Sequence, residues 1–237
     1  MLIDTHTHIP NLEGVDKIVF AAAGMDEIPP VLDAAEKNPN IFCTLGVHPE
    51  YIGTAPDYEK FLDNPKVVGL GDIGLDYHYD SGHKKEQIDL FSRQLDIARR
   101  AALPVAIHTR EADGDTIEIL HDLPAGGTLH CFTSSYDLAR VMLDRGFFIS
   151  AGGIITFKNA ADLRETFAKI PLDRLVAETD SPYCAPVPFR GRPCAPSMMI
   201  ETIKCLAEIK NTPLIEMERI LWDNSHRLYP KLCQGKL

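Results

Sequence analysis

Basic residues are scarce in this chain. Its 237 residues include 24 Lys and Arg against 34 Asp and Glu, which gives a formal net charge of −10. Proteins that grip long nucleic acids over a broad surface need a basic footprint, and this composition disfavours that mode of binding. A small site that reads the end of a strand stays open, because bound cations can supply the positive charge there.

Long apolar runs and a secretory signal are also missing. The longest apolar run, from Ile18 to Met25, is far shorter than the roughly 18 residues that a membrane span requires. The first residues, Met1-Leu2-Ile3-Asp4, contain no basic segment followed by an apolar stretch. We therefore expect a soluble, cytoplasmic protein that makes no contact with membranes.

Cysteine is present but shows no pattern. None of the six cysteines forms a CxxC pair, and their density is below that of a disulfide scaffold, so we interpret them as reduced thiols of an intracellular protein. Cys131 directly follows His130 and could bind a metal ion. Successive residues of a strand face opposite ways, which favours packing over metal binding for Cys131.

The sequence contains no internal repeat, no low-complexity tract and no linker. With 45% hydrophobic residues, a chain of this length can fill one large core. We therefore predict a single domain that spans residues 1–237.

Apolar, β-branched runs alternate with helical patterns, which is typical of a parallel α/β fold. The runs predict buried strands at about residues 2–5, 17–22, 41–46, 67–71, 104–107, 127–130, 147–151 and 174–178. Helical patterns cover residues 28–37, 84–102, 112–121, 135–145 and 160–169. The count matches a (β/α)8 TIM barrel. Only residues 9–16 separate the first two strands, so we expect the first crossover helix to be reduced or missing.

Two extra helices are predicted after the last strand. Pro196 and Ser197 open the first, over about residues 197–210. Thr212 as the cap and Pro213 at the first helical position open the second, whose apolar residues recur at helical spacing. We interpret both helices as packing elements.

Histidines and an aspartate close several predicted strands. In Asp4-Thr5-His6-Thr7-His8, the two imidazoles point the same way about 7 Å apart, which suits two ligands of one ion if the strand bends. His108, His130 and Asp180 end three later strands. A lone histidine at such a place is more often structural, but four at three strand ends favour a divalent metal centre. The carboxyl ends of barrel strands meet at one face, where we expect this centre.

Acidic residues of Gly69-Leu70-Gly71-Asp72-Ile73-Gly74-Leu75-Asp76-Tyr77 extend the pattern. Two metal ions about 3.5–4 Å apart need a shared oxygen ligand, and Asp72 is the candidate bridge. Asp76 either holds a ligand or substrate or is a plain turn aspartate. Glu178, two residues before Asp180 on the same face, is assigned a supporting role.

The ordered set of motifs resembles the TatD family of metal-dependent deoxyribonucleases. The set comprises Asp4 to His8, Gly46-Val47-His48-Pro49, Gly71 to Tyr77, Pro104 to His108, His130-Cys131-Phe132 and Glu178 to Tyr183. Each motif is short, but their order and spacing are specific and span nearly the whole chain. The resemblance implies an amidohydrolase-like TIM-barrel hydrolase that uses divalent metal ions, two per chain. It also implies His6, His8, His108, His130 and Asp180 as metal ligands, with Asp72 as the bridge.

The chain departs from the family pattern at three places. Family members usually carry glutamate at Asp72, so the bridge is one methylene shorter and the second ion is left open. The loop at residues 189–196 keeps two arginines but has Cys194 and Ala195 in place of the family's Asn and Glu. Glu50 stands where the family often has a second histidine. These changes could redirect substrate choice while the metal centre stays usable.

Asp180 and His48 are the predicted catalytic residues. A bound divalent metal lowers the pKa of water from about 15.7 towards about 7, and Asp180 is then placed to take its proton. His48 is predicted to contact a phosphate or to donate to the leaving group. The alternative for His48 is a plain loop histidine.

Arg190, Arg192, Asp76 and Tyr183 are the predicted substrate contacts. The two arginines lie in a loop stiffened by prolines and a glycine, and a guanidinium can clasp a phosphate. A solvated surface pair is the alternative. Tyr77 and Tyr183 could stack on a base, although rim packing is favoured because aromatic platforms usually come in sets.

Three functions compete. The resemblance and the arginine loop favour a nuclease that removes nucleotides from DNA ends. The acidic charge and the altered loop leave open a metal hydrolase of an ester or amide, such as an aminoacyl ester on tRNA. A non-catalytic barrel kept for an interaction is disfavoured by the retained ligand candidates, and no obligate protein partner is evident. The metal is zinc, manganese, magnesium or nickel, although four histidines disfavour a pure magnesium site.

Overall fold

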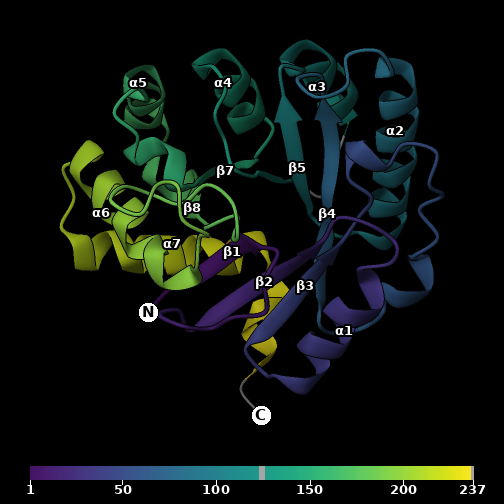
Figure 1. Cartoon of the computed structure of the whole chain (residues 1–237), viewed down its shortest axis with the longest axis horizontal. Helices are drawn as coiled ribbons and strands as arrows, with labels where there is room; N and C mark the ends of the chain where they lie inside the picture. The colour runs from purple at the N-terminus through teal and green to yellow at the C-terminus, as the bar shows by residue number, and fades with distance from the viewer. Residues whose placement is uncertain (123–125, 236–237) are drawn as a thin grey trace.

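The barrel prediction is confirmed by a computed structural model that describes residues 1–122 and 126–235 (Figure 1). The described residues form eight parallel strands in the order β1 to β8, so each strand pairs with its neighbour in the chain. Their bounds are β1 Ile3–Thr7, β2 Lys17–Ala22, β3 Ile41–Leu45, β4 Val67–Asp76, β5 Val105–Arg110, β6 Gly127–Leu129, β7 Phe148–Ala151 and β8 Leu175–Ala177. Just beyond β8, Asp180 N–H donates to the His6 carbonyl and His8 N–H donates to the Ser181 carbonyl. These bonds bring the first and last strands together into a nearly closed barrel.

Helices cover the outside of the barrel (Figure 1). They are α1 Ile28–Lys37, α2 Lys84–Ala101, α3 Asp113–Ile119, α4 Tyr136–Asp144 and α5 Ala161–Lys169, followed after β8 by α6 Met199–Ile209 and α7 Leu214–Leu228. Both extra helices after β8 are confirmed, but the predicted start of α7 was wrong. Pro213 takes the cap position, and the Thr212 hydroxyl donates to the Lys210 carbonyl instead of capping the helix.

Two crossovers contain no α-helix among the described residues. The β1–β2 connection is too short for one, as predicted. The β3–β4 connection has two single-turn 3-10 helices, Pro49–Tyr51 and Glu59–Phe61, in a stretch for which the sequence analysis predicted no helix. Three prolines in residues 46–66 explain why no α-helix forms there, because an interior proline removes a backbone donor and clashes with the preceding helical turn.

Strand β4 is longer than predicted, and this changes the site. It continues five residues beyond the predicted end at 71, through Asp76. Glycines disfavour a strand, which is why the sequence suggested an earlier end. Gly74 is nevertheless required, because a Cβ there would lie 1.9 Å from the carbonyl oxygen of His108 on β5. The close approach of the two strands brings Asp76 beside the end of β5.

The barrel interior changes from apolar to polar along the strands. Near the strand starts lies a cluster that we call the apolar base: Ile3, Val19, Phe42, Val68, Phe148, Val176, Leu228, Tyr229 and Leu232. Residues i and i+2 of a strand share a face, so Thr44, Ser150 and Glu178 come next, all fully buried. The histidines and acids lie at the opposite end of the barrel from the apolar base.

No helix of the described residues combines the length and the apolar character needed to cross a membrane. That residues 1–237 form one domain stays a prediction.

Candidate metal centre

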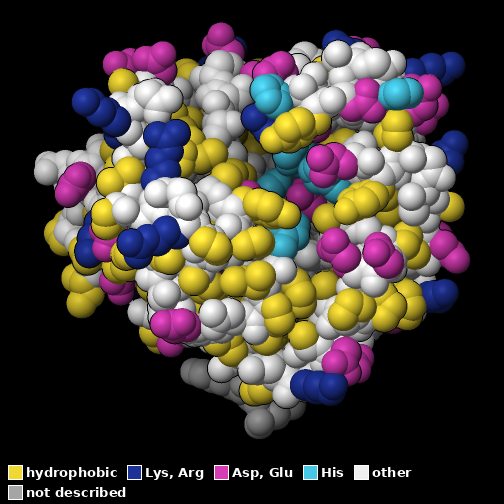
Figure 2. All heavy atoms as spheres, in the orientation of Figure 1, with side chains coloured by type: hydrophobic (Ala, Val, Ile, Leu, Met, Phe, Trp, Pro, Cys, Tyr) yellow, Lys and Arg dark blue, Asp and Glu magenta, His cyan; other side chains and the backbone are white. Residues whose placement is uncertain are grey.

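The predicted ligands come together at the carboxyl ends of the strands. Histidine side chains lie in a hollow near the middle of the face in Figure 2, with acidic side chains beside them. Among the described residues, potential ligand atoms of histidines and acids that all lie within 4.8 Å of one another form three groups: His6, His8 and Asp180; His6, Asp72 and His130; His48, Asp72 and His108. Each of the six predicted ligands belongs to at least one group, and Asp72 belongs to two.

The first group sets two imidazoles and a carboxylate around one point. His6 Nε2 lies 3.3 Å from His8 Nε2, which lies 3.5 Å from Asp180 Oδ1. His8 Nδ1 lies 3.2 Å from the Ala21 carbonyl oxygen, which only accepts, so a neutral His8 carries its proton on Nδ1 and a lone pair on Nε2. Two nitrogens on one tetrahedral zinc ion lie about 3.3 Å apart. The spacing of His6 and His8 therefore fits a shared ion.

In the second group, Nδ1 of His130 contacts the carboxylate of Glu178, which is not itself a member of the group. His130 Nε2 lies 3.2 Å from Asp72 Oδ1, and His130 Nδ1 lies 3.3 Å from Glu178 Oε1. A carboxylate that accepts a hydrogen bond from Nδ1–H orients the ring and leaves Nε2 free for a metal ion. Glu178 is itself held by the Ser150 hydroxyl at 2.5 Å and the Cys131 N–H at 2.6 Å. This arrangement agrees with the supporting role predicted for Glu178.

Three atoms of this group lack partners among the described residues, and one of them is His6 Nδ1. Within residues 1–122 and 126–235, Asp72 Oδ1 and His130 Nε2 are buried and have no partner in hydrogen-bond geometry, although they face one another. An unsatisfied buried polar atom costs about 1–3 kcal/mol. A divalent cation would satisfy the oxygen and the imidazole lone pair together. The residues present therefore fit a divalent metal ion.

The third group contains His48 and His108, which differ in their contacts. His108 Nε2 lies 2.9 Å from Asp76 Oδ2, while Asp76 Oδ1 accepts the N–H groups of His78 and Tyr79. Asp76 is thus a turn aspartate and the partner of a predicted ligand. His48 Nδ1 accepts the Glu50 N–H at 3.3 Å. A neutral His48 therefore carries its proton on Nε2, 4.0 Å from Asp72 Oδ2.

Neighbouring histidines oppose the effect of burial on the pKa of two carboxyl groups in the centre. Burial raises the pKa of Asp72, but the neighbouring His130 and His48 outweigh it and hold the pKa well below its usual range. Burial likewise raises the pKa of Asp180, and its hydrogen bond with His8 outweighs that effect, so the net pKa is lowered. Both side chains are carboxylates at neutral pH.

The histidines of the centre do not all favour the same charge. Burial lowers the pKa of His130, but the charge of Asp72 outweighs it and holds the pKa well above its usual value. Burial, and then repulsion by His130, lowers the pKa of His6 well below its usual value. Burial lowers the pKa of His48 to about 4. At neutral pH both rings are therefore uncharged, as a metal ligand or a neutral hydrogen-bond donor must be.

The predicted substrate residues differ in their burial and contacts. Tyr183 is 62% exposed, and its ring centre lies 6.1 Å from that of His8. Tyr77 is buried and donates to Asp115, which agrees with rim packing. Arg190 and Arg192 are exposed, and among the described residues neither forms an ion pair. The Arg190 guanidinium lies 4.4 Å from the Phe157 ring centre.

Two exposed tyrosines were missed by the sequence analysis. Tyr51 follows β3 and Tyr79 follows β4, and they are 45% and 67% exposed. Each comes three residues after a predicted site residue, His48 or Asp76, and this spacing was the available signal. Cys184, four residues after Asp180, was also missed, and no sequence pattern singles it out.

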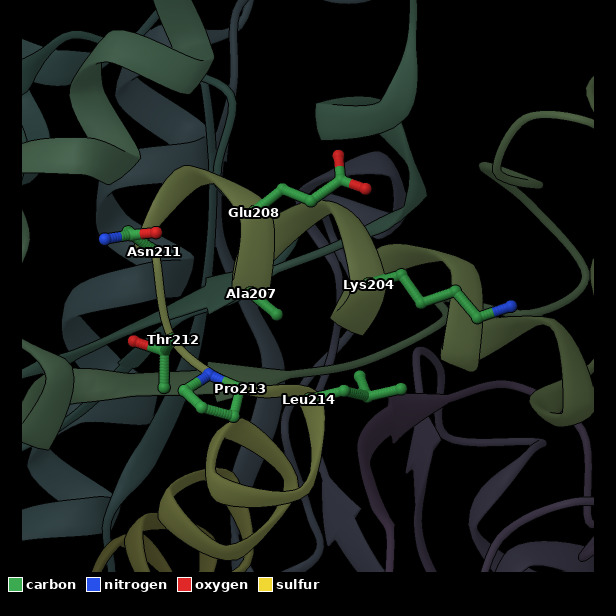
Figure 3. A pocket seen from close by; sticks show the side chains of 7 residues that line it. All are labelled: Lys204, Ala207, Glu208, Asn211, Thr212, Pro213 and Leu214. Carbon is green, nitrogen blue, oxygen red and sulfur yellow. The ribbon is translucent and has the colours of Figure 1, made fainter.

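A separate depression of about 600 Å³ lies where α6 ends and α7 begins (Figure 3). Lys204, Ala207, Glu208, Asn211, Thr212, Pro213 and Leu214 line it. None of these is a predicted ligand, so the depression is distinct from the histidine cluster.

Comparison with known proteins gives a consistent result. A family model described as TatD related DNase matches residues 3–230. The uncharacterized metal-dependent hydrolase YcfH of Escherichia coli (strain K12) is 36% identical over 252 aligned positions, which cover 96% of this chain and 95% of that protein. The crystal structure of YJJV, a TatD homolog from Escherichia coli K12, matches with a TM-score of 0.91 at 31% identity and covers 97% of this chain and 98% of its own. An uncharacterized amidohydrolase from Saccharomyces cerevisiae shares the fold, with a TM-score of 0.76 at 18% identity over 96% of this chain and 99% of its own.

Proposed function

Because the chain belongs to the family of TatD-related DNases, we propose that this metal-dependent hydrolase cleaves phosphodiester bonds at the ends of DNA strands. The observation that carries the proposal is the sharing of Asp72 between two groups of potential ligands at the mouth of the barrel. A carboxylate between two imidazole groups is what a two-metal phosphodiesterase needs.

The two oxygens of Asp72 support a bridging role despite its short side chain. Oδ1 lies 3.2 Å from His130 Nε2, and Oδ2 lies 3.8 Å from His6 Nε2. The carboxylate thus faces both sets of nitrogens. His6, His8 and Asp180 would hold one ion, and His108 and His130 would hold the other, with Asp72 shared. This division follows the two oxygens of Asp72, which face His6 and His130 separately. Four histidines favour zinc, manganese or nickel over magnesium alone.

The chain's own groups account for proton handling and orientation. Divalent ions, when bound, lower the pKa of water and neutralise the charge of the phosphate that is attacked. Asp180 is ionised at neutral pH, so its carboxylate accepts the proton of the attacking water. The neutral His48 ring offers Nε2–H to a phosphate oxygen or to the leaving group. Glu178 keeps His130 in the tautomer whose Nε2 faces the centre.

Exposed aromatic rings support a nucleic acid as the substrate. Tyr51, Tyr79 and Tyr183 follow β3, β4 and β8 at the end of the barrel that holds the histidines. Base stacking on an aromatic ring contributes about 1–3 kcal/mol and tolerates any base sequence. Arg190 and Arg192, exposed in the segment that follows the last strand in the chain, are available for the phosphates.

One observation favours the alternative, an ester or amide hydrolase. Glu50 is 55% exposed, and its carboxylate lies 3.4 Å from His48 Nδ1. Together with acidic side chains beside the hollow in Figure 2, it opposes an incoming phosphate. A substrate with fewer charges, such as an aminoacyl ester, would not meet this repulsion.

A substrate panel tests the proposal. The protein is stripped by a chelator, reloaded with Zn²⁺, Mn²⁺ or Ni²⁺, and incubated with end-labelled single-stranded DNA, duplex DNA, aminoacyl-tRNA and simple amides. We expect metal-dependent release of mononucleotides from single-stranded DNA. Activity confined to acyl or amide substrates would contradict the proposal and support the alternative.

A further inference from the structure

Two thiols adjoin the proposed metal centre without a role in it. Cys131 Sγ lies 3.9 Å from Cys184 Sγ, and Cys184 Sγ lies 3.6 Å from Asp180 Oδ2. All three side chains are only partly buried, and their ligand atoms lie within 4.8 Å of one another. Asp180 meets the histidines through its other oxygen, Oδ1. The carboxylate therefore stands between two sets of donors.

The spacing of these atoms is that of ligands on one ion. Two thiolates about 2.3 Å from a tetrahedral zinc ion are about 3.8 Å apart, and a thiolate and a carboxylate oxygen on the same ion are about 3.6 Å apart. The observed separations are 3.9 and 3.6 Å. A disulfide needs its sulfurs about 2.05 Å apart, so the thiols are far from that geometry.

The local backbone turns the three side chains inward. Cys131, Asp180 and Cys184 have φ angles of 40°, 55° and 54°, in the left-handed region that residues other than glycine seldom adopt. Strand β6 ends at Leu129, so strand alternation does not govern Cys131. Strand alternation, on which the preference for packing at Cys131 was based, therefore does not apply at this position.

We propose that Cys131, Cys184 and Asp180 form an additional binding site for a thiophilic divalent cation, Zn²⁺ or Cd²⁺, beside the histidine-rich centre. Binding breaks both S–H bonds, forms two sulfur–metal bonds and releases two protons to solvent, with no change of oxidation state. Three protein ligands leave one position for water. Sulfur ligands select soft cations, whereas the histidine and carboxylate groups take harder ones.

The shared carboxylate couples the two sites. A cation on the thiols draws on Asp180 Oδ2, while the proposed centre uses Oδ1 of the same group. Loss of the two histidines of the first group removes the neighbouring centre but leaves all three donors of the thiol site. The binding inference can therefore be tested separately from the proposed function.

The experiment is a Cd²⁺ titration of the reduced, metal-free, full-length protein in a non-thiol reductant. Bound cadmium is counted by mass spectrometry, and sulfur ligation is read from the ultraviolet thiolate-to-cadmium charge-transfer band, which histidine ligation does not produce. We expect a band that saturates at about one Cd²⁺ per chain, with release of about two protons per ion. A variant with His6→Ala and His8→Ala should keep the band.

Matched cysteine variants decide the assignment. Cys131→Ser and Cys184→Ser should each weaken the affinity measured by the band at least about 100-fold, since even indirect partners of a metal contribute 10- to 100-fold. Cys205→Ser, which removes an equally half-buried thiol elsewhere, should leave the band unchanged. Cys184→Ala repeats the test if the serine variant does not fold. No band in the wild type, or an equal band in the Cys131 and Cys184 variants, overturns the proposal.

Discussion

The two ends of the barrel are built from the same strands but bury side chains of different polarity. At the apolar base, Phe148 and Val176 pack with Tyr229 inside a closed cluster. Two residues further along the same strands, Ser150 and Glu178 are fully buried and polar. Burial at the base stabilises the fold through the hydrophobic effect. Burial at the mouth places charged and polar groups where solvation is lost, and a bound cation is needed to offset that loss.

The comparison teaches that stability and chemistry are separated along the strand axis. The apolar base contributes to folding whether or not a metal is present. The mouth contains buried donors and acceptors without partners, Asp72 Oδ1 and His130 Nε2 among them. Such groups destabilise the metal-free protein, and proteins retain them where function requires them, here for metal binding. Substitutions at the mouth should therefore lower activity more than stability, and substitutions at the apolar base should lower stability more than activity. We expect the following effects in order of decreasing size.

His130→Ala should have the largest effect on turnover. Loss of this predicted ligand should lower kcat/KM on the best substrate at least about 1,000-fold, or about 4 kcal/mol in the activation barrier. The unfolding free energy of the metal-free protein should change less than for the Phe148 variant below, because removal of the buried, unpartnered Nε2 offsets part of the loss of the hydrogen bond between His130 and Glu178. Kinetics and denaturant melts of chelator-treated protein measure the two quantities. Full activity in this variant would show that His130 is no ligand.

Phe148→Ala should show the reverse pattern. Phe148 is 6% exposed in the apolar base, and the guanidinium groups of Arg174 and Arg227 lie 5.5 and 5.6 Å from its ring centre. Truncating a buried phenylalanine costs about 3–5 kcal/mol of stability. Urea denaturation measures the loss, and kcat and metal affinity of the folded fraction should match the wild type. Phe148→Leu is the control and should lose less, while a large fall in kcat would break the separation between the two ends.

The sequence predicted the ends of the strands better than the contacts between them. His6, His130 and Asp180 were found because parallel strands of a barrel send their carboxyl ends to one face. The contact between His108 and Asp76 was not found, because it depends on the length of β4. That length depends on the close approach at Gly74, which no periodicity reveals.

Loop conformation was the second feature that the sequence did not predict. Alternation along a strand predicts side-chain direction only while the strand continues, and β6 ends at Leu129. Beyond that point the left-handed backbone of Cys131 and Cys184 decides where the thiols point.

His48 makes the contribution of the mouth to the unfolding free energy depend on pH. Burial lowers its folded-state pKa to about 4, whereas an unfolded histidine titrates near 6.5. Below pH 6.5 the unfolded chain takes up the proton and the folded protein resists it, so stability is lost as the pH falls towards 4. Between pH 7 and pH 5, the metal-free wild type should lose about 2 kcal/mol more than His48→Gln.

Chemical denaturation at the two pH values measures this difference. The metal must be absent, since a bound cation would add its own pH dependence. Phe148→Leu provides a control from the apolar base and should follow the wild-type pH profile. An identical profile for His48→Gln and the wild type would mean that His48 is accessible to protons in the folded protein.

Glu178→Gln should have the smallest effect, and it probes the boundary between the two ends. Glu178 lies two residues after Val176 of the apolar base and accepts bonds from Ser150, Cys131 and His130. A glutamine keeps the volume but has one acceptor oxygen and no charge, so it holds the His130 Nδ1 proton less strongly. Metal affinity should fall about tenfold, the lower limit for an indirect metal partner.

Calorimetric titration with Zn²⁺ or Mn²⁺ measures the affinity. Repeating the titration at several pH values tests whether the tautomer of His130 explains the weaker binding. If Glu178 acts by holding the His130 tautomer, the weaker binding should persist at every pH at which His130 is neutral. Val176→Ala, on the same strand and facing the same interior, should lower stability without weakening the metal. A glutamine variant with unchanged affinity but a large loss of stability would place Glu178 with the apolar base, and the boundary between folding and chemistry would then lie beyond it, at His130 itself.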